Sequence, residues 1–254
     1  MGRVKHYFVA DVHLGLKLQD VRDEEKAFVD WLDAIAPDAA ALYLLGDIFD
    51  FWWEYKHVVP KGYVRVLGRL AQLADSGVAI HFFKGNHDQW TFGYLEKEIG
   101  MQLHNEPFVV QIGSALFCLE HGDNIGMIDR KRKWLKRLFA SRFLQKCFGM
   151  IHPRWGMGLG YGWSARHRIK AIPVDAYERA LESLCRFAAA FPHPIDYFIF
   201  GHLHTPADLT LPNKARLLVL GEWRSCMQYV VFDEQDGTCV VLPNQEVLHR
   251  QIQK

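Results

Sequence analysis

Five short polar motifs, each placed directly after an apolar run, constrain this chain more than any other feature of its sequence. In chain order they are Asp11-Val12-His13, Gly46-Asp47, Gly85-Asn86-His87-Asp88, His121-Gly122-Asp123 and Gly201-His202-Leu203-His204. The preceding runs, such as Val4–Ala10 and Ala41–Leu45, have the length and composition of buried strands. Loops at strand ends are where sheet-based enzymes build their sites. The motifs therefore predict a sheet-based fold with one functional site at the strand ends.

Strand and helix patterns alternate along the chain and are followed by a run of strands. Asp23–Ile35 and Tyr63–Asp75 have helical spacing, and Val78–Phe83 is a third apolar strand. Further elements are expected as a hairpin around Gly113-Ser114, a helix at Val174–Ala190, and strands at Tyr197–Phe200, Leu217–Leu220, Gln228–Phe232 and Thr238–Leu242. This order predicts an α/β sandwich with a mixed sheet. We expect residues 1–254 to form a single domain, with a basic, aromatic and Gly-rich insertion or lid at about 129–173.

The composition of the chain limits its possible partners and its cellular compartment. The formal net charge is +1, so the whole molecule is not an obvious binder of polyanions. Its five cysteines are scattered and contain no CxxC pair, which argues against a disulfide framework or a thiolate zinc site and favours a reducing compartment. Neither a spanning apolar run nor a cleavable signal is visible in the sequence. We expect a cytoplasmic protein.

The residue types in the motifs suit a pair of metal ions. Residues i and i+2 of an extended segment point the same way, so Asp11 can join His13, and His202 can join His204, at one centre. Asp47 has two carboxylate oxygens and can bridge two ions. Mixed imidazole and carboxylate ligands suit manganese, iron or zinc better than magnesium or calcium.

Charge at such a centre favours a phosphate substrate. Two divalent cations carry four positive charges, whereas Asp11 and Asp47 contribute only two negative charges, so the site stays net positive. Asn86 supplies a neutral amide oxygen, and the histidine that follows it remains free for chemistry. Two metals about 3.5–4 Å apart can hold the attacking and leaving oxygens of an in-line displacement. We therefore expect a metal-dependent phosphoesterase.

The complete motif set resembles the signature of the calcineurin-like metallophosphoesterase superfamily. That resemblance implies a four-layer α-β-β-α sandwich. It also implies one metal held by Asp11, His13, Asp47 and His204, and another held by Asp47, Asn86, His121 and His202. By the same resemblance His87 is the catalytic histidine that stabilises or protonates the leaving oxygen. Asp88 would orient His87 by accepting its other ring proton.

A narrower resemblance is to the UDP-2,3-diacylglucosamine pyrophosphohydrolases of lipid A biosynthesis. It rests on segments that include Ala10–Leu14, Leu42–Phe49, Asp75–Val78 and Val219–Trp223. The implied reaction hydrolyses the diphosphate of a nucleotide-linked glycolipid to UMP and a lipid monophosphate. That family has Gly-Asn-Arg-Asp where this chain has histidine at position 87. The departure leaves open a divergent branch with the same substrate, or a different phosphodiester.

The insertion is the independent sign of a lipid. Eight basic residues lie between positions 129 and 146, interleaved with aromatic and aliphatic ones at i, i+4 spacing. A basic amphipathic helix of this kind suits an anionic membrane surface, here the inner membrane, or an apolar groove for acyl chains. An apolar stripe that simply packs on the domain is an equally good interpretation of the helix taken alone. Substrate contacts are expected from Asn86, His87, Asp129, Arg168, Lys170 and His202, with no nucleic acid partner.

Three other functions remain open at this point. A nuclease or nucleotide phosphodiesterase on the same scaffold would use the basic helix on a nucleic acid backbone. A protein phosphatase would have an open cleft without an apolar lid. A non-catalytic binding scaffold should have lost ligands, and none is missing from the motifs. The aromatic run Phe51-Trp52-Trp53 is interpreted as a packed corner rather than as a pocket wall.

Overall fold

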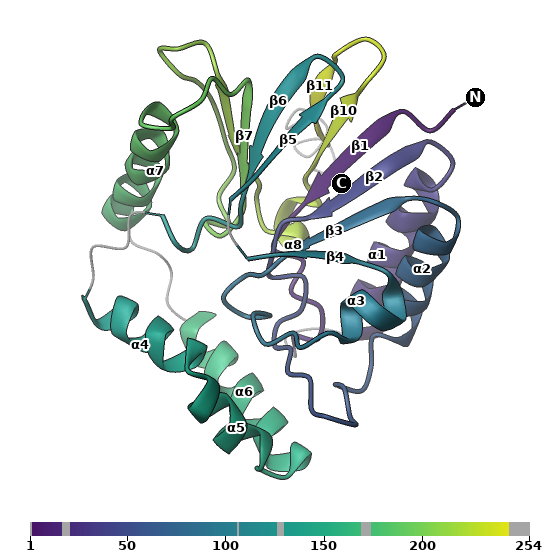
Figure 1. Ribbon diagram of the computed structural model, residues 1–254, viewed down its shortest axis with the longest axis vertical. Coiled ribbons are helices and arrows are strands. Elements are labelled where there is room, and N and C mark those ends of the chain that lie inside the picture. Colours follow the sequence, from purple (N-terminus) through teal and green to yellow (C-terminus); the bar gives the residue numbers. More distant parts are fainter. Residues whose placement is uncertain (1, 17–20, 106, 126–129, 169–173, 244–254) are drawn as a thin grey trace, which may run out of the picture.

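Two β-sheets packed face to face form the centre of the protein (Figure 1), in a computed structural model that describes residues 2–16, 21–105, 107–125, 130–168 and 174–243. The first sheet has the order β11-β10-β1-β2-β3-β4 and the second the order β5-β6-β7-β9-β8. The strands of the first sheet are β1 (Lys5–Val9), β2 (Ala39–Leu44), β3 (Ala79–Phe83), β4 (Gln102–His104), β10 (Tyr229–Asp233) and β11 (Cys239–Leu242). Those of the second are β5 (Phe108–Ile112), β6 (Ala115–Leu119), β7 (Tyr197–Phe200), β8 (Ala207–Thr210) and β9 (Arg216–Val219).

Both sheets are mixed, as the sequence predicts. Strands β1 to β4 run parallel to one another, and β10 and β11 add antiparallel to that set. In the second sheet β6, β7 and β9 are parallel, while β5 and β8 are antiparallel edge strands. All five polar motifs follow parallel strands, so they emerge from carboxyl ends of strands.

Helices cover the outer face of each sheet. The first sheet is covered by α1 (Val21–Ile35), α2 (Val64–Asp75) and α3 (Tyr94–Ile99), and the second by α7 (Val174–Ala189) (Figure 1). A short helix, α8 (Trp223–Cys226), follows β9. The expected α/β sandwich with four layers is confirmed.

The alternation of side chains along β1 explains these layers. Tyr7 and Val9 point outward and pack in one buried cluster with Phe28 of α1. Phe8 points inward and stacks on Phe117 of the second sheet, with ring centroids 5.6 Å apart. Because successive strand residues face opposite sides of a sheet, one apolar run supplies both cores.

Three consecutive helices lie beneath the strand ends in Figure 1: α4 (Arg130–Ala140), α5 (Arg142–Gly149) and α6 (Pro153–Arg168). The single basic helix expected over residues 129–146 is wrong in its extent, because the backbone is extended at Ser141 (φ −65°, ψ 114°) and separates α4 from α5. The division into one domain with an insertion at 129–173 stays a prediction. Within the described segments no helix is both long and apolar enough to cross a membrane.

Candidate dinuclear metal centre

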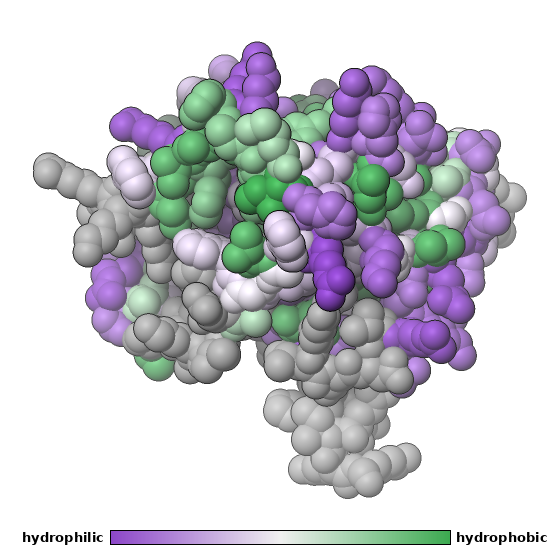
Figure 2. Space-filling view, turned by 90° about the horizontal axis from the view of Figure 1, so that it is seen from below, coloured by the Kyte–Doolittle hydropathy of each residue, from purple (hydrophilic) through white to green (hydrophobic). Residues whose placement is uncertain are grey.

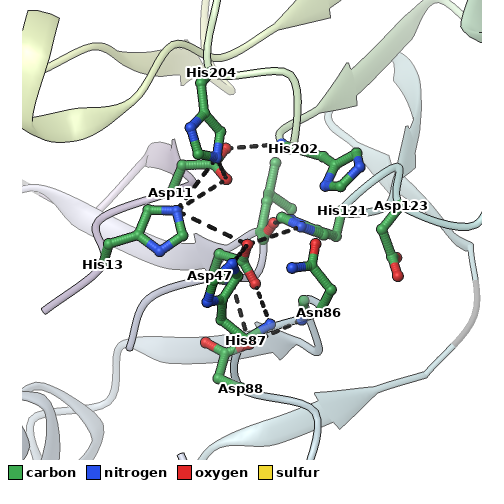
Figure 3. Close-up of polar contacts among 12 residues, drawn as sticks. Asp11, His13, Asp47, Asn86, His87, Asp88, His121, Asp123, His202 and His204 are labelled. Carbon is green, nitrogen blue, oxygen red and sulfur yellow. Dashed lines mark hydrogen bonds and ion pairs between the residues drawn. The ribbon is translucent and has the colours of Figure 1, made fainter. Parts of the chain in front are cut away.

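The five motif loops converge on one point at the end of the sandwich where the carboxyl ends of these strands meet (Figure 3). Loops that follow β1, β2 and β3 come from the first sheet, and loops that follow β6 and β7 come from the second. The seven predicted ligand residues that they carry are Asp11, His13, Asp47, Asn86, His121, His202 and His204. The structure therefore brings together side chains separated by as many as 193 positions in the chain.

An unusual backbone conformation is shared by most of these residues. Asp11, His13, Asp47, His202 and His204 all have positive φ values, between 51° and 70°. A residue with a Cβ atom is destabilised by roughly 1 kcal/mol or more in the left-handed region. Such strain persists only where surrounding contacts hold the backbone in that conformation. Five strained residues at one point indicate that the loops are held in place for these side chains.

Glycines allow the loops to approach one another closely. A Cβ atom on Gly85 would overlap the side chain and backbone nitrogen of Asp47. At Gly201 a Cβ atom would come within 2.7 Å of both Ala10 Cβ and Asp11 Oδ2. Gly85 and Gly201 are therefore required by the close packing of the loops that carry the candidate ligands.

Each carboxylate has one oxygen anchored and one oxygen left for a ligand. The backbone N–H of His202 donates to Asp11 Oδ2 at 2.8 Å, and the backbone N–H of His87 donates to Asp47 Oδ1 at 2.8 Å. The second oxygens, Asp11 Oδ1 and Asp47 Oδ2, are buried and find no hydrogen-bond partner among the residues that the structure describes. The same holds for Asn86 Oδ1 and His121 Nε2.

Buried polar atoms without partners are costly unless a ligand meets them. Three of these atoms lie close to other candidate ligand atoms: His204 Nε2 lies 3.4 Å from Asp11 Oδ1, and His121 Nε2 lies 3.4 Å from Asp47 Oδ2. Atoms that coordinate one ion at about 2.1 Å are themselves roughly 3–3.5 Å apart. The arrangement thus fits divalent metal ions.

The first candidate group consists of Asp11, His13, Asp47 and His204. His13 Nε2 lies 3.4 Å from His204 Nε2 and 3.8 Å from Asp47 Oδ2. All these atoms point toward a common centre in Figure 3. The donor atoms are a carboxylate oxygen of Asp11, one imidazole nitrogen each from His13 and His204, and the oxygen of Asp47 beside them. This is the kind of donor set that the sequence predicts.

The second candidate group consists of Asp47, His121 and His202. His121 Nδ1 donates to the carbonyl oxygen of Leu45 at 2.8 Å, so Nε2, which faces Asp47, is the nitrogen that the neutral ring would offer to a metal. Asn86 lies beside this group in Figure 3. Asp47 belongs to both groups, and its Oδ2 atom faces His13 on one side and His121 on the other.

Protonation states in the site suit cation binding. Burial alone would raise the pKa of Asp47, but the imidazoles of His121 and His87 hold the pKa of this carboxyl well below its usual range. Burial lowers the pKa of His202 to about 4, so its imidazole is neutral. A carboxylate and a neutral imidazole are the forms in which these residues bind metals.

Asp88 is not placed as the sequence analysis expects. Its carboxylate accepts four backbone N–H groups, those of Asp47 (3.2 Å), Ile48 (2.7 Å), Phe49 (3.2 Å) and Gly85 (2.9 Å). Burial and the charge of Asp47 together raise the pKa of Asp88 to about 7. The expectation that Asp88 orients the ring of His87 is therefore corrected: Asp88 ties the loop after β2 to the loop after β3.

The ring of His87 is held by two other residues. Its Nδ1 atom lies 2.9 Å from the carbonyl oxygen of Asp50 and 3.1 Å from Oγ of Ser164, which belongs to α6. Its Nε2 atom faces the centre, 4.0 Å from Asp47 Oδ2. Neither contact of the ring was predicted from the sequence. Only the spacing of small residues in α6 could have indicated that this helix packs closely on its neighbours.

Some predicted substrate contacts fall where the structure gives no side chain. Asp129 and Lys170 lie outside the described residues, and so does the side chain of Arg168. The run Phe51–Trp53 is buried, as the packed-corner interpretation expects: Phe51 and Trp53 pack with Trp90, and Trp52 packs in the core of the first sheet. A further link was not predicted: Lys136 of α4 forms an ion pair with Asp123 at 2.6 Å.

Comparison with known proteins identifies relatives of this chain. The family model described as calcineurin-like phosphoesterase matches residues 4–206. A UDP-2,3-diacylglucosamine hydrolase from Porphyromonas gingivalis is 39% identical over 96% of this chain and 98% of its own length. A protein of the same name from Aeromonas salmonicida is 30% identical over 85% of each chain. The solved structure of a dimetal phosphatase from Danio rerio aligns over 94% of this chain and 95% of its own, with 13% identity and a TM-score of 0.45.

Proposed function

Because the chain belongs to the calcineurin-like phosphoesterase family, we propose that it hydrolyses the diphosphate of UDP-2,3-diacylglucosamine, releasing UMP and a lipid monophosphate. The observation that carries the reaction type is the shared carboxylate Asp47, whose unpartnered oxygen faces imidazoles on both sides. Support for the substrate comes from the two relatives that bear this name and match most of the chain.

The seven ligand residues would divide between two ions, which we propose to be manganese. Asp11, His13 and His204 would hold one, and Asn86, His121 and His202 the other, with Asp47 Oδ2 between them. The mixture of imidazole, carboxylate and amide donors suits manganese, iron or zinc. When bound, such a pair stabilises the charge on a phosphoryl group and supplies a water of lowered pKa.

His87 would act on the leaving oxygen. A water oxygen adds to one phosphorus of the diphosphate, the bond from that phosphorus to the bridging oxygen breaks, and the departing oxygen takes a proton from Nε2 of His87. The proton that the water releases then restores His87. Nδ1 keeps its own proton, because both of its neighbours accept hydrogen bonds. Asn86 and His202, which lie at the same centre, would also contact the substrate.

Helices α4 to α6 would bind the lipid part. Large apolar side chains stay exposed on them, including Trp134 (64%), Phe143 (73%) and Trp155 (68%). Figure 2 views this side of the molecule and shows hydrophobic residues gathered among hydrophilic ones. Basic residues of α4 and α5 accompany them. We propose that this surface binds acyl chains and the anionic inner membrane, and that Asp129, Arg168 and Lys170 bind the polar part of the substrate.

The substrate is tested by incubating the manganese-loaded protein with UDP-2,3-diacylglucosamine in detergent and measuring UMP. We expect UMP and lipid monophosphate in equal amounts, and none from the Asp47→Ala variant. Parallel reactions contain single-stranded DNA or a phosphopeptide instead. Cleavage of DNA or of the phosphopeptide without release of UMP would replace this proposal by a nuclease or a protein phosphatase.

A further inference from the structure

We propose that Ser164 of α6 is a positioning residue for His87, so that docking of this helix fixes the orientation of the ring of the catalytic histidine. The inference rests on the proposed role of His87 as proton donor. The hydroxyl of Ser164 would then belong to the site, although α6 lies outside the motif loops that supply the other residues.

Three hydrogen bonds carry the inference. Ser164 Oγ donates to Asp50 Oδ1 at 2.8 Å, and its lone pairs face His87 Nδ1 at 3.1 Å. The carbonyl oxygen of Asp50 lies 2.9 Å from the same nitrogen. Ser164 is 1% exposed and Asp50 is 2% exposed, so water does not compete for these bonds. A hydroxyl whose proton goes to a carboxylate can only accept from the ring.

The proton of His87 is therefore assigned to Nδ1. Two acceptors, a carbonyl and a hydroxyl oxygen, converge on that nitrogen, and a ring nitrogen without a proton would repel both. Nε2 is then the ring nitrogen that faces the metal centre, 4.0 Å from Asp47 Oδ2. Removal of the hydroxyl leaves one acceptor and lets the ring rotate about its side-chain bonds.

A row of small residues allows α6 to come this close. Gly156, Gly160 and Ser164 are spaced at i, i+4 and i+8, so they lie on one helix face. A Cβ atom on Gly160 would overlap the ring of Phe51, and one on Gly156 would overlap the hydroxyl of Tyr55.

The neighbouring glycines of α6 behave differently. A Cβ atom on Gly158 or Gly162 would meet nothing within 4 Å. Only the row that ends in Ser164 is thus required to be small. A second polar contact holds the same helix, because the hydroxyls of Tyr161 and Tyr63 lie 2.9 Å apart and Tyr63 also donates to the carbonyl oxygen of Leu14 at 3.2 Å.

The test compares two phosphodiesters whose leaving groups differ in basicity. Nitrophenolate departs without protonation, whereas phenolate depends more on a delivered proton. We expect Ser164→Ala to lower kcat for diphenyl phosphate about tenfold, with KM unchanged, and to lower kcat for bis-p-nitrophenyl phosphate less than about twofold. Ser183→Ala is the matched control, because this buried hydroxyl of α7 donates to the carbonyl of Arg179 at 2.8 Å, away from the site.

A matched glycine pair tests the docking itself. Gly160→Ala should reproduce the effect of Ser164→Ala by holding α6 away from Phe51, whereas Gly162→Ala should behave as the unmodified protein. An equal loss on both esters in Ser164→Ala, or equal behaviour of the two glycine variants, would overturn the positioning role.

A separate experiment on the metal-free protein measures which ring nitrogen of His87 carries the proton, from the ¹⁵N chemical shifts of the imidazole. For the neutral ring we expect the proton on Nδ1 in the unmodified protein, and a mixture of the two tautomers in Ser164→Ala. An Nε2-protonated ring, or no change in the variant, would contradict the inference. The ¹⁵N measurement tests the positioning role of Ser164 even if the unmodified protein hydrolyses neither ester. Absence of hydrolysis would instead contradict the proposed function.

Discussion

The backbone N–H of His87 donates to one oxygen of Asp47 at 2.8 Å, while the other oxygen of Asp47 lies 4.0 Å from the ring of the same histidine. The proposed bridging ligand and the proposed proton donor are thus fixed to each other through the backbone. Any shift of Asp47 moves the point that the ring of His87 faces. The two roles are geometrically coupled, and several consequences can be measured.

Replacing the shared carboxylate should remove a metal. Asp47→Asn keeps an oxygen for the N–H of His87 but loses the negative charge between the two groups. We expect metal content to fall from two ions per chain to one or none, and hydrolysis of bis-p-nitrophenyl phosphate to fall at least about 100-fold. Elemental analysis and kinetics measure both. Asp208→Asn, which alters an exposed ion pair with Arg216, is the control and should change neither.

Asp88 should matter for stability first. An amide in place of its carboxylate would turn an N–H₂ group toward some of the four backbone donors. We expect Asp88→Asn to lower the free energy of unfolding by about 2–4 kcal/mol, measured by chemical denaturation. Unchanged stability combined with a large loss of kcat would instead restore Asp88 to the role of partner of His87.

Gly85 should tolerate no side chain. Because a Cβ atom there would overlap Asp47, we expect Gly85→Ala to lose metal binding and to lower the melting temperature. Gly68→Ala is matched to it, since a Cβ atom on this glycine of α2 meets nothing and alanine favours a helix. Equal metal binding by the two variants would show that the loops do not need their close approach.

A buried histidine pair should make the fold sensitive to mild acid. Burial lowers the pKa of His81 to about 4, and its Nδ1 lies 3.0 Å from His104 Nε2. Between about pH 6.5 and pH 4 the unfolded chain binds a proton at His81 that the folded chain does not, so stability decreases as the pH falls through this range, by up to about 3 kcal/mol. Denaturation at several pH values should show a flatter dependence for His81→Gln than for the exposed control His57→Gln.

The exposed side chains of α5 and α6 should govern binding to anionic vesicles. Phe143→Asp and Trp155→Asp each remove an exposed apolar group without disturbing the core. We expect each to weaken co-sedimentation with vesicles containing phosphatidylglycerol about tenfold, because apolar burial at the interface is lost. Val64→Asp, on the exposed start of α2, should bind as the unmodified protein does. Identical binding by all four proteins would contradict the proposed membrane surface.

Much of the fold was predictable because each polar motif follows an apolar strand. Alternation along β1, with Tyr7 outward and Phe8 inward, also shows why one run serves two cores. Short elements were missed, since α3, β4, β8 and α8 contain between three and six residues each and carry too little periodicity.

The site was predictable to a different degree. Residue types and spacing indicated which side chains gather, but not the left-handed backbone of Asp11 or His204, because packing rather than residue type imposes it. The contact of Ser164 with Asp50 joins positions 114 apart and depends on how α6 docks. No local pattern encodes such a contact.

The proposed function requires Asp47 to lie between two metal ions. Anomalous diffraction from a manganese-soaked crystal measures this directly. We expect two peaks about 3.5–4 Å apart on either side of Asp47, one beside His13 and His204 and the other beside His121 and His202. A single peak, or a peak among His13, Asp50 and His87 instead, would contradict it.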